Sequence, residues 1–141
     1  MEVILDASAI MAIILNEPNK DNVIELTKNA ILLAPEVISF EIGNALINLY
    51  LKHKITENGL IAAYKSYASI PMRIIEVDVQ KALRIACKYG IYAYDAYYLE
   101  IASRHNLPLI SFDRLMKKVG IDLKIRFPDI PTGKEENDES L

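Results

Sequence analysis

Four acidic residues, widely separated in the sequence, stand where the chain could do chemistry. They are Asp6, Glu41, Asp95 and Asp113. Carboxylates that are brought together repel one another, and burial raises their pKa values, so a cluster of them is costly without a cation. A site made only of oxygen ligands suits Mg²⁺ or Mn²⁺ and does not suit zinc. If the fold gathers these residues, the chemistry they indicate is metal-assisted hydrolysis of a phosphodiester bond.

The segments around these acids alternate between strand and helix patterns. Short apolar runs predict buried strands at 1–5, 30–34, 73–77, 109–111 and 123–125. Apolar residues at helical spacing predict helices at 7–15, with Ser8 as a possible cap, and at 19–28, 36–53, 56–69, 79–89, 94–105 and 113–119. Strands that alternate with helices indicate βαβ units, so we expect an α/β fold with a central parallel sheet flanked by helices in three layers.

This arrangement predicts that the four acids meet at one edge of the sheet. A helix packed on a parallel sheet runs against its strands, so helix N-termini and strand C-termini share an edge, where ligands bind in such folds. Asp6 and Asp113 each follow a strand, whereas Glu41 lies in the second turn of its predicted helix and Asp95 in the first turn of its helix. Asp78 also follows a strand, but an outer one, and we interpret it as a helix cap only.

Each acid taken alone has an ordinary explanation as a turn or cap residue. Glu41 is the most informative, because its helix has a strongly apolar stripe beside it. Asn44 and Asn48 extend the polar line from Glu41 at positions i+3 and i+7. A polar line along the border of an apolar face is expected where a helix lines a pocket, so Asn44 is a candidate supporting residue.

Length and composition favour one cytoplasmic domain. The chain has 141 residues, of which 52% are hydrophobic and 25% charged. No apolar run approaches the roughly 20 residues that a membrane-spanning helix needs, and the N-terminus lacks the pattern of a signal peptide. The single cysteine, Cys87, excludes an internal disulfide, and its apolar neighbours favour a buried thiol. We expect a domain over 1–131 and a disordered acidic tail over 132–141.

The net charge of −3 argues at first against a nucleic-acid partner. However, the tail carries four acids and one lysine, so residues 1–131 hold 15 acids and 15 bases. If four of those acids hold metal, the remaining surface is mildly basic. Arg114, Lys117 and Lys118 lie beside the fourth acid and are candidate RNA contacts, although a solvated charged surface explains them equally well.

Four segments together resemble the PIN-domain ribonucleases, and especially the VapC-like toxins of toxin-antitoxin pairs. They are Val3–Ser8, Pro35-Glu36 with Phe40–Leu46, Tyr94–Leu99, and Ile110–Leu115. The resemblance covers about residues 1–130, in the order and at the spacing of the family. It implies a sheet of five parallel strands in the order 3-2-1-4-5, a homodimer, and cleavage of RNA that depends on Mg²⁺ or Mn²⁺.

Carried over residue by residue, the resemblance implies that Asp6, Glu41, Asp95 and Asp113 form the catalytic, metal-binding quartet. Ser8 and Ser111 match small hydroxyl residues that would hydrogen-bond carboxylates or waters of the site. Some relatives carry a further acid just after the fourth, where this chain has Lys117 and Lys118. Whether the site holds one ion or two is therefore open.

The leading hypothesis is an Mg²⁺- or Mn²⁺-dependent endoribonuclease that acts as the toxin of a toxin-antitoxin pair. The alternatives are a housekeeping RNA-processing nuclease and a noncatalytic RNA-binding or scaffolding module of the same fold. A second apolar face on the long helix predicts a protein partner, either another protomer or an antitoxin. It consists of Phe40, Ile47, Tyr50 and Leu51. Tyrosines 92, 94, 97 and 98 flank Asp95 and either stack on bases or belong to the core or a dimer contact.

Overall fold

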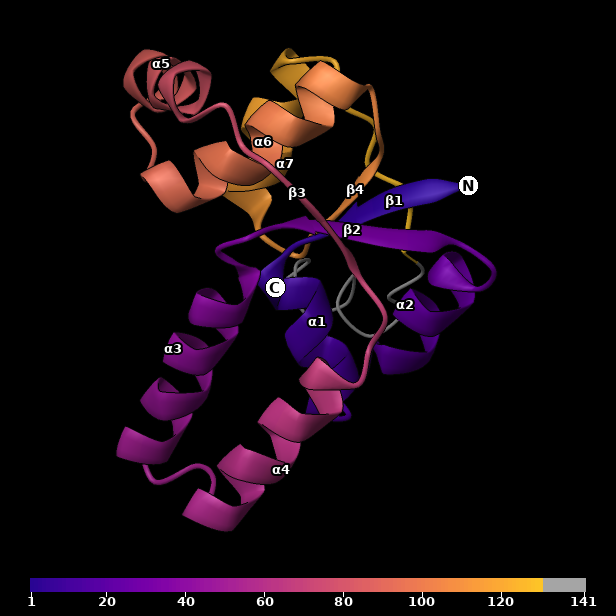
Figure 1. Cartoon of the computed structure of the whole chain (residues 1–141), viewed down its shortest axis with the longest axis vertical. Helices are drawn as coiled ribbons and strands as arrows, with labels where there is room; N and C mark the ends of the chain where they lie inside the picture. Colours follow the sequence, from indigo (N-terminus) through magenta and orange to yellow (C-terminus); the bar gives the residue numbers. More distant parts are fainter. Residues whose placement is uncertain (131–141) are drawn as a thin grey trace, which may run out of the picture.

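A parallel sheet lies at the centre of the molecule, between two groups of helices (Figure 1). The computed structural model describes residues 1–130, so the predicted disordered tail lies outside the described residues. The strands are β1 (Glu2–Leu5), β2 (Ile31–Pro35), β3 (Arg73–Ile75) and β4 (Leu109–Ile110). They lie in the order β3-β2-β1-β4 and every neighbouring pair is parallel. The predicted α/β class, and the order of these four strands, are confirmed.

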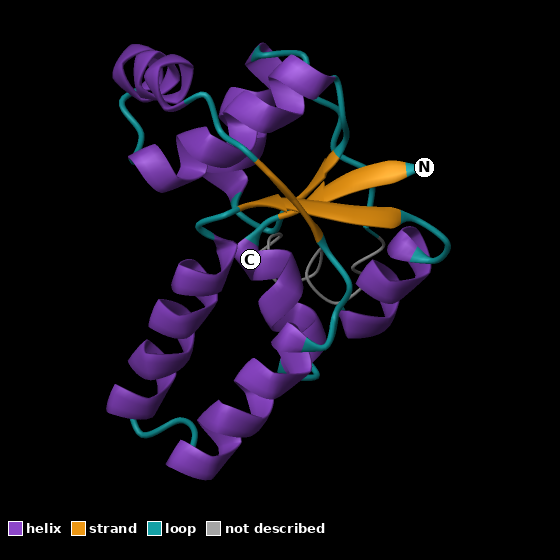
Figure 2. Cartoon of the chain, viewed as in Figure 1, coloured by secondary structure: helices purple, strands orange, loops and turns teal. Residues whose placement is uncertain are grey.

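The helices cover both faces of the sheet, as Figure 2 shows. They are α1 (Ala7–Ile14), α2 (Lys20–Thr27), α3 (Ile38–Leu51), α4 (Glu57–Ala68), α5 (Val79–Tyr89), α6 (Ala93–His105) and α7 (Arg114–Asp122). The first four lie on one side of the sheet and the last three on the other, and α3 and α4 form a pair that extends away from it (Figure 1). None of the helices within residues 1–130 is long and apolar enough to span a membrane.

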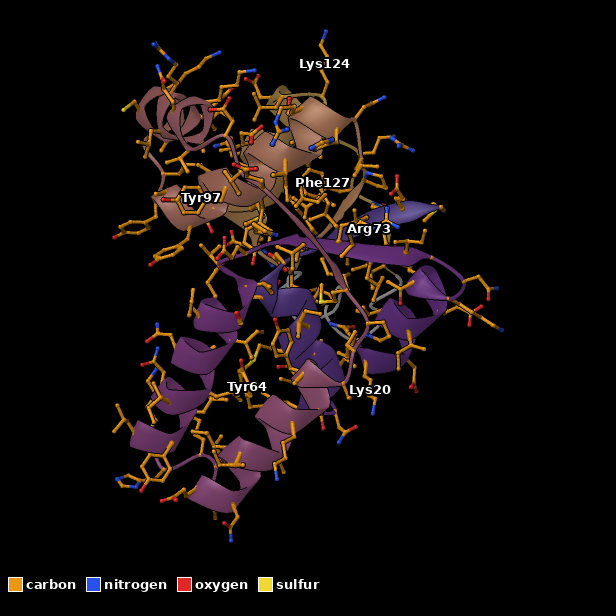
Figure 3. The ribbon with its side chains drawn as sticks, viewed as in Figure 1. Lys20, Tyr64, Arg73, Tyr97, Lys124 and Phe127 are labelled. Carbon is orange, nitrogen blue, oxygen red and sulfur yellow. The ribbon has the colours of Figure 1, made fainter. Side chains whose placement is uncertain are left out.

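The core forms around β1, because this strand is central and is covered on both faces. Val3, Ile4 and Leu5 have no exposed surface, as expected for a continuous apolar run in a parallel sheet. An ion pair also links β3 to β1 across β2: Arg73 on β3, labelled in Figure 3, and Glu2 on β1 lie 3.1 Å apart. The apolar pattern of the sequence therefore places β1, and with it Asp6, in the middle of the fold.

The predicted fifth strand at 123–125 is wrong for the described chain. These residues close α7 instead: Lys124 has a φ of 63°, its N–H donates to the Ile121 carbonyl, and the Ile125 N–H donates to the Gly120 carbonyl. This pair of bonds is the Schellman arrangement that ends many helices. Glycine normally takes this left-handed position and marks the end of a helix. Here a lysine takes it, and the sequence Leu-Lys-Ile shows the apolar-polar-apolar alternation that is typical of a strand.

The single cysteine is also not where the sequence suggested, because Cys87 is exposed. Helix α5 packs against α6 through one face, on which Ala82 is fully buried. Cys87 lies five residues further along, on the side of the helix that faces away from Ala82. Its apolar neighbours in the sequence point in other directions, so they were a poor guide to the burial of the thiol.

Candidate functional site

Asp6 lies at the junction between β1 and α1 and is almost fully buried, with 3% of its surface exposed. Its Oδ1 accepts a hydrogen bond from the Ala9 N–H at 3.0 Å, so Asp6 is the N-cap of α1. The sequence suggested Ser8 as the cap, and this prediction is wrong, because β1 ends at Leu5 and the helix already begins at Ala7. Ser8 instead donates from its hydroxyl to Asp6 Oδ1 at 2.6 Å.

The register of the sheet brings a second serine to the other oxygen of Asp6. Leu5 on β1 pairs with Ile110 on β4, so the next residues, Asp6 and Ser111, lie side by side. The Ser111 hydroxyl donates to Asp6 Oδ2 and accepts from the Asp113 N–H at 3.0 Å. The carboxylate of Asp6 is therefore held by three donors, from Ser8, Ala9 and Ser111.

Asp113 caps the N-terminus of α7 in the same way that Asp6 caps that of α1. Its side chain is the N-cap of α7 and accepts from the Met116 N–H at 3.0 Å. The connection from β4 to α7 is also tied to α1, because the Phe112 N–H donates to the Ser8 hydroxyl at 2.9 Å. One hydrogen-bonded network thus joins the first and fourth predicted acids.

Glu41 and Asp95 approach the same place from two other helices. Both lie in the first turn of their helix, Glu41 in α3 and Asp95 in α6, and both are half-buried. Their electrostatic coupling shows that the acids are neighbours. The charge of Asp6 raises the pKa of both Glu41 and Asp95, and the charge of Asp113 raises the pKa of Asp6 and of Asp95. Helix polarity and strand order together bring all four acids to one edge, as expected.

Burial and mutual repulsion shift these carboxyls in one direction. Burial is the main cause that raises the pKa of Glu41 to about 7 and the pKa of Asp95 to about 6. It also raises the pKa of Asp6, against the opposing effect of the hydrogen bonds from Ser111, Ser8 and Ala9. Carboxyls with raised pKa values gain from a nearby cation, which favours their charged form.

The residues of the site fit a hard divalent cation. The donor set consists of carboxylate oxygens, which is the ligand type of Mg²⁺ and Mn²⁺. Glu41 Oε1 is buried and makes no hydrogen bond of ordinary geometry among the described residues, so the protein alone does not fully hold this carboxylate. Within residues 1–130, no three acidic, histidine or cysteine side chains lie in an arrangement that would already hold an ion.

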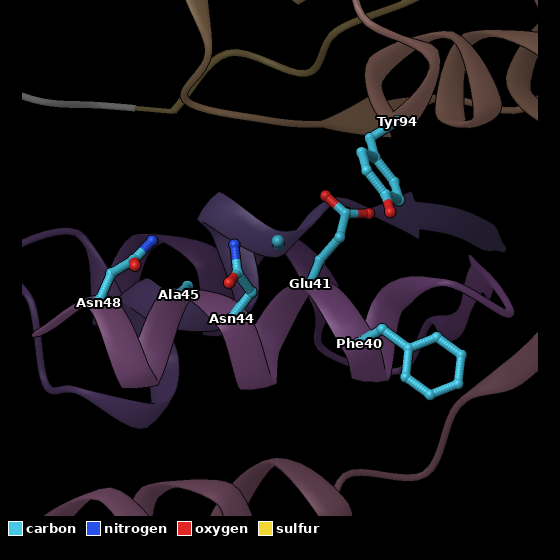
Figure 4. Close-up of a pocket in the computed structure, with 7 residues that line it drawn as sticks. Phe40, Glu41, Asn44, Ala45, Asn48 and Tyr94 are labelled. Atoms are coloured by element: carbon cyan, nitrogen blue, oxygen red, sulfur yellow. The ribbon is translucent and has the colours of Figure 1, made fainter. Parts of the chain in front are cut away.

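A pocket of about 310 Å³ opens beside Glu41, along α3. It is lined by Ala7, Phe40, Glu41, Asn44, Ala45, Asn48 and Tyr94. Figure 4 shows Glu41, Asn44 and Asn48 on one side of α3, with the Tyr94 ring opposite Glu41. The polar line that the sequence spacing indicated therefore does line a pocket, and Asn44 lies next to Glu41 in it.

The comparison with protein families decides the identity of this arrangement. A family model described as PIN domain matches residues 3–122, which include all four acids. The chain belongs to the PIN domain family. PIN domains are generally nucleases and generally use divalent metal ions.

Solved structures share the PIN fold over most of this chain. PAE2754 from Pyrobaculum aerophilum is 23% identical with a TM-score of 0.65, covering 88% of this chain and 90% of that one. VapBC2 from Rickettsia felis, bound to a DNA fragment from their promoter, is 14% identical with a TM-score of 0.62, covering 91% and 98%. FitAcB from Neisseria gonorrhoeae is 15% identical with a TM-score of 0.59, covering 90% and 96%. At these identities the likeness is one of fold. No curated protein gives a significant match.

The structure of this PIN domain adds a residue that the sequence did not single out. Tyr98 on α6 is 1% exposed, and its hydroxyl lies close enough to Glu41 to affect the pKa of that carboxyl. The sequence left Tyr98 among four tyrosines with several possible roles. Its spacing was the available signal, because Tyr98 lies three residues after Asp95 and so shares a helix face with it.

The basic candidates of this PIN domain lie on α7, directly after Asp113. Arg114 and Lys118 are exposed, whereas Lys117 is partly buried. Their spacing of three and four residues places them on one face of the helix. They are thus close in sequence to the acidic edge, on the element that Asp113 caps.

Proposed function

We propose that this PIN domain is an endoribonuclease that depends on Mg²⁺ or Mn²⁺ and hydrolyses phosphodiester bonds in RNA. The observation that carries this proposal is the convergence of four acids, from four different elements, on one edge of the sheet. Asp6, Glu41, Asp95 and Asp113 are the residues that would hold the metal. A bound divalent ion supplies a lowered pKa for a water molecule and stabilisation of negative charge on the phosphate.

The four acids would contribute differently, because the structure holds them differently. Asp6 is fixed by three donors and Asp113 by its helix cap. These two carboxylates are therefore oriented in advance, which lowers the cost of arranging them when a ligand arrives. Glu41 and Asp95 are half-buried on α3 and α6, which cover opposite faces of the sheet, and both must give up their protons near neutral pH.

RNA would lie over the acidic edge and the adjoining pocket. Asn44 and Asn48 offer amide donors and acceptors there, and the half-exposed Tyr94 ring offers a stacking surface. Arg114, Lys117 and Lys118 would contact phosphates on the α7 side. A noncatalytic RNA-binding module is the weaker alternative, because four clustered acids without a cation would repel the phosphate backbone.

We further propose that the protein is the toxin of a toxin-antitoxin pair and acts in the cytoplasm. The motif resemblance to VapC-like toxins supports this, and the fold shared with VapBC2 agrees with it. The second apolar face supports a protein partner: Phe40 is 71% exposed and Leu51 is 65% exposed, with Ile47 and Tyr50 also exposed between them. A second copy in a homodimer, a protein antitoxin, or both would cover this face.

The direct test is cleavage of RNA by the purified protein. Single-stranded and hairpin RNAs should be cut internally with Mn²⁺ or Mg²⁺ and left intact with EDTA. Persistence of all substrates at millimolar metal would contradict the nuclease proposal. Light scattering on the purified protein, and coexpression with the protein encoded by the adjacent gene, test the dimer and the antitoxin. A housekeeping nuclease would show neither growth arrest on expression nor rescue by that neighbour.

A further inference from the structure

Two buried polar atoms lack a hydrogen-bond partner within the described chain, and they lie next to each other. They are Glu41 Oε1 on α3 and the Tyr98 hydroxyl on α6. The Tyr98 hydroxyl faces the Glu41 carboxyl closely enough to act on it as a donor, which lowers the pKa of Glu41, but the contact falls short of ordinary hydrogen-bond geometry. Buried polar groups are well paired in the great majority of cases, so two that face each other without a well-formed bond point to an interaction that is completed only under another condition.

The Tyr98 hydroxyl is not needed for packing. The ring belongs to the main apolar cluster and is almost fully buried. Phenylalanine would fill the same space without placing an unpaired hydroxyl in the core, which is unfavourable. The stability of the metal-free fold therefore does not account for the hydroxyl at this position.

Glu41 is the acceptor that remains for this hydroxyl. Three titratable groups lie close enough to raise the pKa of the Tyr98 hydroxyl, namely Glu41, Asp6 and Tyr67. Both oxygens of Asp6 already accept hydrogen bonds, from Ser8 and Ala9 on one side and Ser111 on the other. Tyr67 on α4 interacts with Ser39.

The donors around the acids are unevenly distributed in a way that fits this assignment. Asp6 has three donors and Asp113 has one, whereas Glu41 Oε1 has none. Carboxylates that bind metals are themselves held by hydrogen bonds, and the loss of such a partner typically lowers the metal affinity by roughly 10-fold to 100-fold. Tyr98 can supply one proton and remains neutral, because burial raises the pKa of its hydroxyl.

We propose that Tyr98 is a positioning residue for Glu41: when a divalent cation occupies the acidic edge, the Tyr98 hydroxyl donates to one oxygen of Glu41 and leaves the other oxygen for the cation. This inference rests on the proposed metal site and goes beyond it, because it assigns the residue that orients one ligand. It also explains why the contact between the Tyr98 hydroxyl and Glu41 is incomplete in the structure, which would be a feature of the unloaded site.

The test compares Tyr98→Phe with Tyr97→Phe in the full-length protein. Tyr97 is the adjacent residue on α6, is half-buried and contacts Tyr94 edge-on with the ring centroids 5.9 Å apart. In EDTA, Tyr98→Phe should melt at the temperature of the wild type or above it, because the buried hydroxyl that is removed makes no well-formed hydrogen bond in the metal-free fold. Its Mn²⁺ dissociation constant, measured by calorimetry, should rise about tenfold or more. Tyr97→Phe should leave both measurements unchanged.

A double-mutant cycle shows whether Tyr98 acts through Glu41. In a Glu41→Gln background, Tyr98→Phe should add little to the loss of Mn²⁺ affinity, because the residue it orients is already gone. Unchanged affinity in Tyr98→Phe, or a lower melting temperature in EDTA with a normal metal response, would overturn the inference while leaving the nuclease proposal intact. A wild-type protein that binds neither Mn²⁺ nor Mg²⁺ would overturn both.

Discussion

The Ser111 hydroxyl donates a hydrogen bond to Oδ2 of Asp6, although the two residues are 105 positions apart in the chain. They meet because β1 and β4 are parallel neighbours and Leu5 lies opposite Ile110. The same hydroxyl accepts from the Asp113 N–H, so one serine connects two of the four acids. The geometry of the candidate site is thus set by the pairing of β1 with β4.

Replacing this serine should damage stability as well as activity. Ser111→Ala removes a donor from the buried Asp6 and leaves the Asp113 N–H without its acceptor. We expect a loss of about 1–3 kcal/mol in the free energy of unfolding, measured by urea denaturation. Ser103→Ala, at an exposed position on α6, is the matched control and should change little. Equal stability of the two variants would contradict this role of Ser111.

Removal of single site charges should abolish cleavage without unfolding the protein. Asp6→Asn and Asp95→Asn keep the shape of the side chain and remove a charge that burial already disfavours. Both variants should retain the circular dichroism spectrum and lose RNA cleavage that depends on Mn²⁺. Asp78→Asn is the control, because Asp78 is the N-cap of α5 and asparagine caps equally well. If purified Asp6→Asn or Asp95→Asn cleaved RNA like the wild type, the catalytic assignment would be wrong.

Metal-free protein should become less stable as the pH rises from about 4 to about 8. The pKa of Glu41 is raised to about 7 and that of Asp95 to about 6, from 4.5 and 3.8. Between the ordinary and the raised values the native state holds protons that the unfolded chain has released. Their stabilising contribution is therefore complete below the ordinary pKa and is lost as the pH passes through about 6 to 7.

The check is a series of melting temperatures in EDTA for wild type and for the double variant Glu41→Gln, Asp95→Asn. The variant cannot titrate at these positions, so its advantage over the wild type should grow with pH. Parallel curves for the two proteins would show that the two carboxyls are not shifted in the native state.

Divalent metal should raise the melting temperature. A ligand that binds only the native state, at 100 times its dissociation constant, stabilises by about 2.7 kcal/mol, which corresponds to roughly 5–10 °C for a chain of this size. The increase should be larger at higher pH, because the ligands must be deprotonated. Differential scanning fluorimetry with Mg²⁺, Mn²⁺ and EDTA measures it. A melting temperature that ignores millimolar metal would count against the site.

One buried acid should matter for the fold and not for metal binding. Glu100 is 2% exposed, accepts from the Asp78 N–H at 2.6 Å and pairs with Arg104 at 2.7 Å. Arg104 in turn donates to the Glu76 carbonyl at 2.7 Å, so this pair fastens the β3–α5 connection to α6. Arg104→Met should cost about 3 kcal/mol in the free energy of unfolding, because it leaves a buried carboxylate unpaired.

The Mn²⁺ affinity of folded Arg104→Met should equal that of the wild type, measured by calorimetry well below the melting temperature. This result would separate Glu100 from the acids of the candidate site. A large loss of metal affinity in the folded variant would show that the pair also orients α6 for Asp95.

The sequence by itself indicated the layered α/β fold and the meeting of the four acids, whereas the order of the strands was implied only by the resemblance to the PIN-domain family. The first two features follow from local patterns: apolar runs specify buried strands, and the direction of helices on a parallel sheet sends Glu41 and Asp95 to the edge where Asp6 ends its strand. Where the pattern was ambiguous, it misled. Lys124 takes a conformation usually reserved for glycine, so a helix end resembled a strand.

Tertiary structure decided the contacts between side chains that are distant in the chain. The position of the Tyr98 hydroxyl beside Glu41 depends on where the fold brings α6 and α3 together at the edge of the sheet, and the burial of Glu100 against the start of α5 depends on how α6 packs against α5. The exposure of Cys87 depends on which face of α5 meets α6. Spacing along a helix tells which residues share a face, but the neighbour that covers that face is set only when the whole chain has packed.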